Sequence, residues 1–154
     1  MPTLTSLVYK PAGLGDDPES HYLRVSVTEA ELVAGRGIKG DLKGVANRPL
    51  NIMTAETLAV LTGEGFQTGP GQMGEQIVFS GLDVDALAEG DRVQIGDEAV
   101  VEIIKPRTGC DRFEHIQGRN PSLVQGRMGQ MAKVVVGGVI RVGDTVKVLQ
   151  KENV

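Results

Sequence analysis

Apolar residues alternate with polar ones in many short segments of this chain. In "RVSV" (24–27), "RVQI" (92–95) and "TVKV" (145–148) every second residue is apolar. That period is typical of strands with one buried face and one exposed face. β-Branched residues are frequent in these segments, which also favours extended structure. Strands are therefore predicted over residues 5–9, 22–28, 50–53, 75–79, 92–95, 99–104, 132–136, 139–142 and 145–149.

One segment has a clear helical pattern. Residues 54–62 predict a helix with Thr54 as its N-cap, Glu56 in the first turn and Gly63 at its end. A weaker helical turn is predicted within 111–117. Many short strands with little helix between them favour a mainly β fold of the barrel type, with a few short helices, over a parallel α/β sheet.

Glycine marks several turns between the predicted strands. Gly137 and Gly138 separate two apolar runs, which predicts a two-residue hairpin. The segments "EGDRVQIGD" (89–97) and "VGDTVKVLQ" (142–150) share a Gly-Asp pair followed by an alternating strand. A Gly-Asp turn leading into a strand explains both segments without any duplication of function.

Composition and charge limit the class of protein. The 154 residues are 40% hydrophobic and 23% charged, which fits one globular domain over 1–154. A net charge of −4 argues against nucleic acid or an anionic membrane as the main partner. No apolar run approaches the roughly 20 residues that span a bilayer, and the first 13 residues do not resemble a signal peptide. One cysteine cannot form an internal disulfide, so a cytoplasmic location is expected.

The single cysteine, Cys110, follows a predicted strand that Pro106 ends. Arg107 and Arg112 would favour the thiolate and lower its pKa, whereas Asp111 opposes them. A thiol among cations on a loop is a candidate nucleophile or soft-metal ligand. The competing interpretation is a buried, inert cysteine that packs as a small hydrophobic residue.

Six motifs together resemble the MOSC domain family, which is named for the C-terminal part of molybdenum cofactor sulfurase. The resemblance begins near residue 35, covers nearly all of the chain after it, and implies a β-barrel similar to the barrel domain of pyruvate kinase. The motifs occur in the family's order as "GIKGD" (37–41), "RPLNIMTAETL" (48–58), "PGQMGEQIVFSGLD" (70–83), "EGDRVQIG" (89–96), "KPRTGC" (105–110) and "VGGVIRVGD" (136–144).

Two positions depart from the family's usual pattern. Gln76 stands where the family usually has asparagine, and Gly109 stands where proline is frequent. Because glutamine keeps the amide, hydrogen bonding of Gln76 to the backbone is expected to survive.

The resemblance implies a molybdenum cofactor (molybdopterin) bound through Cys110. A thiolate can be a further soft ligand of the metal, and cations with backbone N–H groups can bind the pterin's phosphate. Cys110 is thus the predicted catalytic residue and metal ligand. The predicted cofactor-binding residues are Lys10, Lys39, Asp41, Lys43, Arg48, Glu75, Arg107 and Arg112.

Two of these residues have structural alternatives. Asp41 can instead form a turn by bonding its own backbone. Glu75 is expected to orient an arginine or to bond backbone N–H groups, in preference to acid–base chemistry.

Three functions remain open from the sequence. The first is reduction of N-hydroxylated compounds or related redox chemistry on a small-molecule substrate, with electrons from a partner reductase. The second is a persulfide carrier, in which Cys110 receives sulfur from a donor, a pyridoxal-phosphate-dependent desulfurase; pyridoxal phosphate binding then belongs to that partner. The third is a non-catalytic binding module with an inert thiol.

Overall fold

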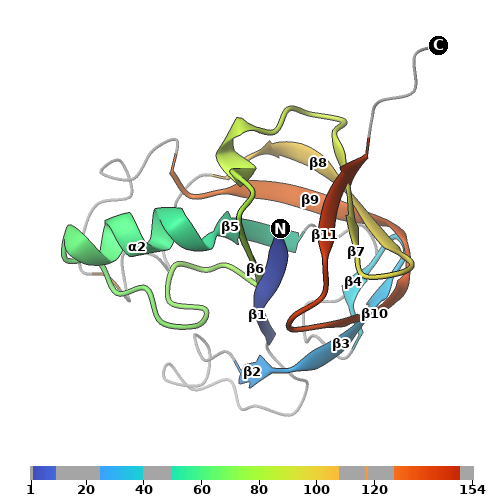
Figure 1. Ribbon diagram of the computed structural model, residues 1–154, viewed down its shortest axis with the longest axis horizontal. Helices are drawn as coiled ribbons and strands as arrows, with labels where there is room; N and C mark the ends of the chain where they lie inside the picture. Colours follow the sequence, from blue (N-terminus) through green and yellow to red (C-terminus); the bar gives the residue numbers. More distant parts are fainter. Residues whose placement is uncertain (1, 10–24, 40–49, 108–116, 118–126, 150–154) are drawn as a thin grey trace.

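The computed structural model describes residues 2–9, 25–39, 50–107, 117 and 127–149 (Figure 1). Its secondary structure is almost entirely strand. The elements are β1 (Thr3–Tyr9), β2 (Val25–Val27), β3 (Glu29–Val33), β4 (Gly37–Ile38), β5 (Leu50–Thr54), α2 (Ala55–Gly63), β6 (Ile77–Ser80), the 3₁₀ helix η1 (Val84–Ala86), β7 (Arg92–Ile95), β8 (Ala99–Pro106), β9 (Gln130–Val136), β10 (Gly138–Arg141) and β11 (Val146–Leu149).

The main sheet has eight strands in the order β11-β7-β8-β9-β5-β6-β1-β2. It curls round so that β1 comes next to the segment that leads into β11 (Figure 1). There Thr3 bridges Thr145, and the backbone N–H of Leu4 donates to the carbonyl of Asp144 at 2.9 Å. The predicted mainly β fold is confirmed, as a curved sheet in which β1 also contacts the segment before β11.

Alternation along the strands places the core inside the curved sheet. In β7, Val93 and Ile95 are fully buried, whereas Arg92 is exposed and Gln94 is half-buried. Burying a side chain of this kind contributes about 1.5–3 kcal/mol. The core continues through the other strands with Leu4, Leu7, Leu50, Ile52, Ile77, Phe79, Val101, Ile103, Ala132 and Val134.

A second sheet of three strands, in the order β10-β3-β4, lies beside the main one. The predicted hairpin at Gly137 and Gly138 is wrong, because β9 pairs with β8 and β5 whereas β10 pairs with β3. Neither glycine has the left-handed φ that a type I′ turn requires. Instead, a Cβ on Gly137 would lie 2.7 Å from the carbonyl oxygen of Leu32. The glycines therefore let the chain pass close to β3 as it changes sheets.

Helix α2 connects the parallel strands β5 and β6. Parallel neighbours require such a crossover, since a tight turn can join only antiparallel strands. The helix lies one residue beyond the predicted range of 54–62. Thr54 stands at the N-cap position but makes no side-chain cap. Its hydroxyl donates to Leu82 O at 3.0 Å and accepts from Val84 N at 2.8 Å, so it fixes the segment after β6 instead.

A smaller apolar cluster lies apart from the main core and contains side chains from helix α2. It consists of Met53, Leu61, Phe66, Met73 and Met128, with Leu58 packed against it. Met73 and Met128 are fully buried, as expected for methionines that fill gaps in a core. Met131, in β9, is only half-buried.

The predicted helical turn within 111–117 lies outside the described residues except for Gln117, which is helical. Within the described ranges, no helix has both the length and the hydropathy needed to cross a bilayer.

Candidate functional site

Residues 67–76, here called the glycine turn, are folded around a buried carboxylate. Glu75 is 1% exposed. Its Oε2 accepts a hydrogen bond from Gly71 N at 2.7 Å, and its Oε1 accepts from Met73 N at 3.1 Å. The expectation that Glu75 bonds backbone N–H groups is met by these contacts. Its role in binding a cofactor stays a prediction.

Burial raises the pKa of Glu75 above its ordinary value of 4.5. The hydrogen bonds from Gly71, from Glu75's own N–H and from Met73, and the positive charge of Arg107, all act in the opposite direction and are outweighed. Burial therefore disfavours the ionised form of this carboxyl group, and the hydrogen bonds offset only part of that cost.

Arg107 follows β8 directly and is held at two points. Its backbone N–H donates to Gly129 O at 3.1 Å. Its Nη1 donates to Met73 O at 2.7 Å, and the side chain is buried. A buried guanidinium bonded to a carbonyl braces the glycine turn against the end of β8. In the described structure Arg107 thus supports the turn, and phosphate binding by it stays a prediction.

Asn51 and Gln76 join the glycine turn to β5. Asn51 Nδ2 donates to Gly74 O at 3.2 Å. The backbone N–H of Asn51 donates to Gln76 Oε1 at 3.1 Å, and Gln76 N donates to Asn51 O at 2.9 Å. The backbone hydrogen bonding expected of Gln76, the residue that replaces asparagine, is confirmed.

Gln117 also binds the glycine turn, and nothing in the sequence predicted it. Its Nε2 donates to Gln67 O at 2.6 Å and to Gln72 O at 3.1 Å. Its Oε1 accepts from Gln67 N at 2.7 Å. The side-chain amide thus pairs with both backbone groups of Gln67. No local pattern could have shown this, since the two residues are 50 positions apart.

Lys39 lies immediately after β4 of the smaller sheet, whereas the glycine turn leads into β6 of the main sheet. Its Nζ is 3.6 Å from Glu31 Oε2, and both side chains are largely exposed. Such an exposed pair contributes little to stability. The structure therefore brings Glu75 and Arg107 together and leaves Lys39 on the smaller sheet. The remaining predicted residues, Lys10, Asp41, Lys43, Arg48, Cys110 and Arg112, lie outside the described residues.

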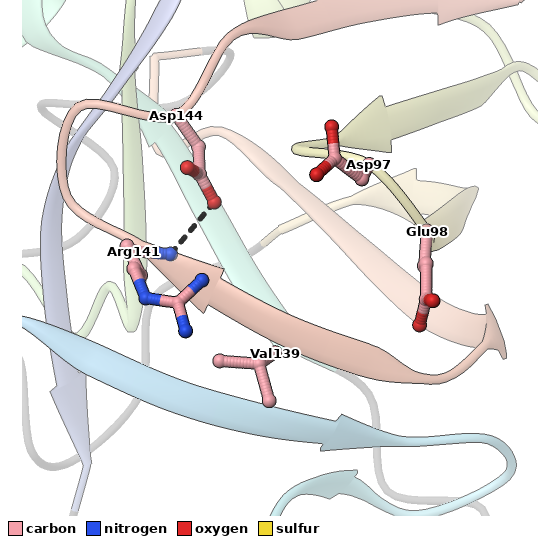
Figure 2. Close-up of a pocket in the computed structure, with 5 residues that line it drawn as sticks. All are labelled: Asp97, Glu98, Val139, Arg141 and Asp144. Carbon is pink, nitrogen blue, oxygen red and sulfur yellow. Dashed lines mark hydrogen bonds between the residues drawn. The ribbon is translucent and has the colours of Figure 1, made fainter.

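A surface pocket of about 280 Å³ lies elsewhere, between the β7–β8 turn and the residues around β10 (Figure 2). Asp97 and Glu98 line one side, and Val139, Arg141 and Asp144 line the other. Asp144 Oδ2 accepts from Arg141 N at 2.8 Å, and Arg141 Nε is 3.0 Å from Glu29 Oε2. No group of three His, Cys, Asp or Glu side chains within the described ranges is arranged to hold a metal ion.

A known protein is similar in sequence to part of this chain. The chain is 28% identical over 85 residues to a protein named "Reductase" from Gibberella moniliformis (strain M3125 / FGSC 7600). That match covers 53% of this chain but only 15% of the relative. The chain therefore spans a small part of that protein's length.

Two solved structures have the same fold at low sequence identity. The crystal structure of YiiM from Geobacillus stearothermophilus matches with a TM-score of 0.70 and 18% identity, over 97% of this chain and 76% of that one. The YUAD protein from Bacillus subtilis matches with a TM-score of 0.73 and 18% identity, over 96% of both chains. The family profile of the MOSC domain matches residues 39–147, more than half of the 154. The chain therefore belongs to the MOSC domain family.

Proposed function

We propose that this MOSC domain binds a molybdenum cofactor through Cys110 and serves reduction of N-hydroxylated compounds or related redox chemistry. The proposal is supported by family membership, together with the motif "KPRTGC" (105–110), in which the single cysteine of the sequence comes four residues after Pro106, the last residue of β8. The name of the relative from Gibberella moniliformis, "Reductase", supports the redox class.

The donor set of the chain fits such a cofactor. One thiolate can serve as a soft metal ligand, and lysines and arginines can bind a phosphate. In this proposal Cys110 binds the metal, and the cations Lys10, Lys43, Arg48 and Arg112 are the principal phosphate ligands. When bound, the cofactor supplies a redox-active metal, and the protein supplies binding and orientation.

Hydrogen bonds hold Arg107, the residue that directly precedes the segment containing Cys110. Cys110 is three residues beyond Arg107, which is hydrogen-bonded through both its backbone and its side chain. A site supported by a rigid element is held more precisely than one on a free loop. We therefore assign Arg107 a supporting role and leave direct phosphate contact to the other cations.

The proposed redox reaction needs an electron donor. These 154 residues hold no flavin, haem or iron–sulfur motif, so the proposed donor is a reductase outside them. In the alternative sulfur-carrier function, the partner is a desulfurase that holds pyridoxal phosphate and passes sulfur to Cys110.

One comparison separates these functions. The protein and its Cys110→Ser variant are purified from a host that makes the cofactor, then analysed for metal and for intact mass. Molybdenum near one atom per chain, lost in the variant, supports the proposal. A cyanide-releasable sulfur on Cys110 with little molybdenum favours the sulfur carrier. A bare thiol that reacts slowly with alkylating reagents at neutral pH, with no metal, favours the inert binding module.

The proposed phosphate-binding role of Arg48 can be tested against a matched control variant. Arg48→Ala is expected to lower the molybdenum content, because it removes a proposed phosphate ligand. Arg92→Ala removes an arginine that is exposed and bonded to Glu102 on the main sheet, and it is expected to leave the molybdenum content unchanged. Equal losses in both variants contradict the assigned role of Arg48.

A further inference from the structure

Four neighbouring strands of the main sheet carry an excess of positive charge on their outer side. Strands β11, β7, β8 and β9 follow one another in the sheet order (Figure 1). Their charged residues are Lys147, Arg92, Lys105, Lys133 and Glu102. The four cations are exposed, and Glu102 is half-buried. These five residues are here called the cationic face.

The pairing register puts all five side chains on the same side of the sheet. Paired residues point to one side, and so do residues two apart in a strand. The relevant pairs are Lys147 with Gln94, Arg92 with Glu102, Glu102 with Lys133, and Lys105 with Met131. The other side of these strands is the core, where Val93, Val101 and Val134 are buried.

Negative charge lies elsewhere in this acidic chain, whose net charge is −4. The other acidic residues of the described ranges lie outside these four strands, at Glu29, Glu31, Glu56, Glu64, Glu75, Asp83, Asp85, Glu89, Asp91, Asp97, Glu98 and Asp144. Asp97 and Glu98, in the β7–β8 turn, line the pocket beside β10 (Figure 2). Such a separation of charge creates a positive potential over one part of the surface.

Glu102 makes the cationic face unsuited to a uniform polyanion. Its Oε1 is 3.1 Å from Arg92 Nε, and its Oε2 is 3.2 Å from Lys133 Nζ. Nucleic acid and an anionic membrane present negative charge throughout, so they would be repelled by this carboxylate. The surface of a folded protein can place single carboxylates opposite the cations and a hydrogen-bond donor opposite Glu102.

The other side chains on this side of the sheet also suit a protein partner. Leu149 is paired with Arg92, and Met131 is paired with Lys105; both apolar side chains are half-buried. Methionine and arginine are enriched in protein–protein interfaces. No aromatic residue, on which a nucleic acid base could stack, occurs in these four strands.

The cationic face borders the candidate functional site. Met131 is the partner of Asn51 in β5, and Asn51 Nδ2 donates to Gly74 O of the glycine turn. Lys105 stands two residues before Arg107, whose Nη1 donates to Met73 O. A protein bound to the cationic face would therefore lie beside the glycine turn.

We infer that the cationic face is a docking surface for an acidic electron-carrier protein. The charge pattern selects an acidic protein, and the role of electron carrier rests on the proposed function, which needs a donor outside these 154 residues. A small surface is sufficient, because electron-transfer complexes are weak and bury less than about 1,200 Å² in total. The inference concerns docking and adds no chemical step to the proposed reaction.

The test measures binding of two purified acidic carriers, a flavodoxin and a [2Fe–2S] ferredoxin. Each is labelled and titrated with the full chain, purified from a host that makes the cofactor, and binding is followed by fluorescence anisotropy. Titrations at about 0.01 M and 0.15 M salt are compared, since the Debye length falls from about 30 Å to about 8 Å between them. At least one carrier is expected to bind at the lower salt concentration, and more weakly at the higher one.

The double variant Lys105→Gln with Lys147→Gln tests the face directly. Neither lysine forms an ion pair within the described residues, so their replacement removes charge without breaking one. The matched control is Lys39→Gln with Arg141→Gln, which removes the same charge from the smaller sheet. Those two cations pair with Glu31 and Glu29 in exposed contacts that contribute little to stability.

The first double variant is expected to weaken binding of the carrier about fivefold or more at the lower salt concentration. The control is expected to change it less than about twofold, because its cations lie off the docking surface. Absence of binding to both carriers, or equal weakening in the two double variants, overturns the inference. Tighter binding of duplex DNA or phosphatidylserine vesicles through Lys105 and Lys147 also overturns it, since the face would then bind phosphate groups.

These outcomes are separable from those for the cofactor. A protein without molybdenum whose binding to a carrier depends on Lys105 and Lys147 refutes the proposed function and supports the docking surface. A protein that holds molybdenum through Cys110 but binds neither carrier does the reverse.

Discussion

The guanidinium group of Arg107 lies against the α-carbon of Gly74, so that a Cβ at Gly74 would overlap Nη2 and lie 3.0 Å from Cζ. Gly74 also has a φ of +85°, a conformation that L side chains rarely adopt. Glycine is thus needed here for two separate reasons. The fold of the glycine turn and the position of Arg107 depend on each other.

Gly74→Ala is therefore expected to destabilise the protein strongly. The left-handed backbone costs an alanine about 1–2 kcal/mol. Displacing Arg107 from Met73 O breaks a buried, charge-assisted hydrogen bond, which costs about 1.5–3 kcal/mol more. Urea denaturation monitored by circular dichroism measures the sum.

Gly90→Ala is the matched control for backbone strain. Gly90 has a φ of +89°, but nothing lies within 4 Å of a Cβ placed there. This variant is expected to lose only the backbone part, about 1–2 kcal/mol. Equal losses of stability in the two variants would show that the position of the Arg107 side chain does not depend on glycine at position 74.

The buried carboxylate of Glu75 predicts a pH dependence of stability. Because burial raises its pKa in the folded state, the folded protein binds this proton more tightly than the unfolded chain. The contribution of this tighter proton binding to the free energy of unfolding is fully present below pH 4.5. It is lost as the pH rises through the folded-state pKa of Glu75. Relative to Glu75→Gln, the wild type should therefore lose free energy of unfolding as the pH rises above 4.5.

Glu102→Gln provides a control of opposite sign. Hydrogen bonding to Arg92, and then to Lys133, lowers the pKa of Glu102 below 4.5. Its stabilising effect is present above pH 4.5 and is lost as the pH falls through the folded-state pKa. Above pH 4.5, the difference between wild type and Glu102→Gln should stay flat. A difference for Glu75→Gln that is equally flat contradicts the prediction.

Local patterns were sufficient to predict many of the strands. The bounds of β7 coincide with the prediction of 92–95, because burial of one face imposes the strict alternation of Val93 and Ile95. Strand β3 was missed for the opposite reason. In "EAELV" (29–33) only Leu32 is buried, and Glu29 and Glu31 pair with Arg141 and Lys39 at the surface.

In the candidate site, too, the contacts between residues close in sequence could be predicted and those between distant residues could not. Glu75 and the N–H groups that it binds lie within four residues, so backbone bonding by Glu75 could be anticipated from the sequence around it. The contact of Arg107 with Met73 joins residues 34 positions apart, and the contact of Gln117 with Gln67 joins residues 50 apart. No periodicity connects such positions, because sheet order and crossovers bring them together. The direct change of sheet at Gly137 was missed for this reason too.

Gly137→Ala is expected to disturb the passage from β9 to β10. Its Cβ would lie 2.7 Å from Leu32 O, a backbone atom that cannot move without displacing β3. Overpacking of this kind costs about 1–3 kcal/mol. The control is Gly63→Ala, since no atom lies within 4 Å of a Cβ at this position and its φ is not left-handed. Thermal unfolding should show a clear loss for Gly137→Ala and none for Gly63→Ala; similar transitions in both contradict the close approach to β3.

The two Gly-Asp turns predict paired effects on stability. Asp91 Oδ2 accepts from Ala88 N, and Asp144 Oδ2 accepts from Arg141 N, each at 2.8 Å and each from three residues earlier. The turns lead into β7 and β11, which are neighbours in the sheet. Asp91→Ala and Asp144→Ala should each cost about 0.5–1.5 kcal/mol, because each leaves one turn N–H without its acceptor.

Removing a negative charge from an acidic chain can itself stabilise it, so the control is Asp97→Ala, which removes an exposed carboxylate from the same pocket as Asp144 (Figure 2). Urea denaturation should show no loss of stability for Asp97→Ala. Replacement of Asp144 by asparagine keeps an acceptor oxygen, so most of the stability should return. If Asp144→Ala behaves like Asp97→Ala, the turn is held by its backbone hydrogen bonds and the side chain of Asp144 contributes nothing.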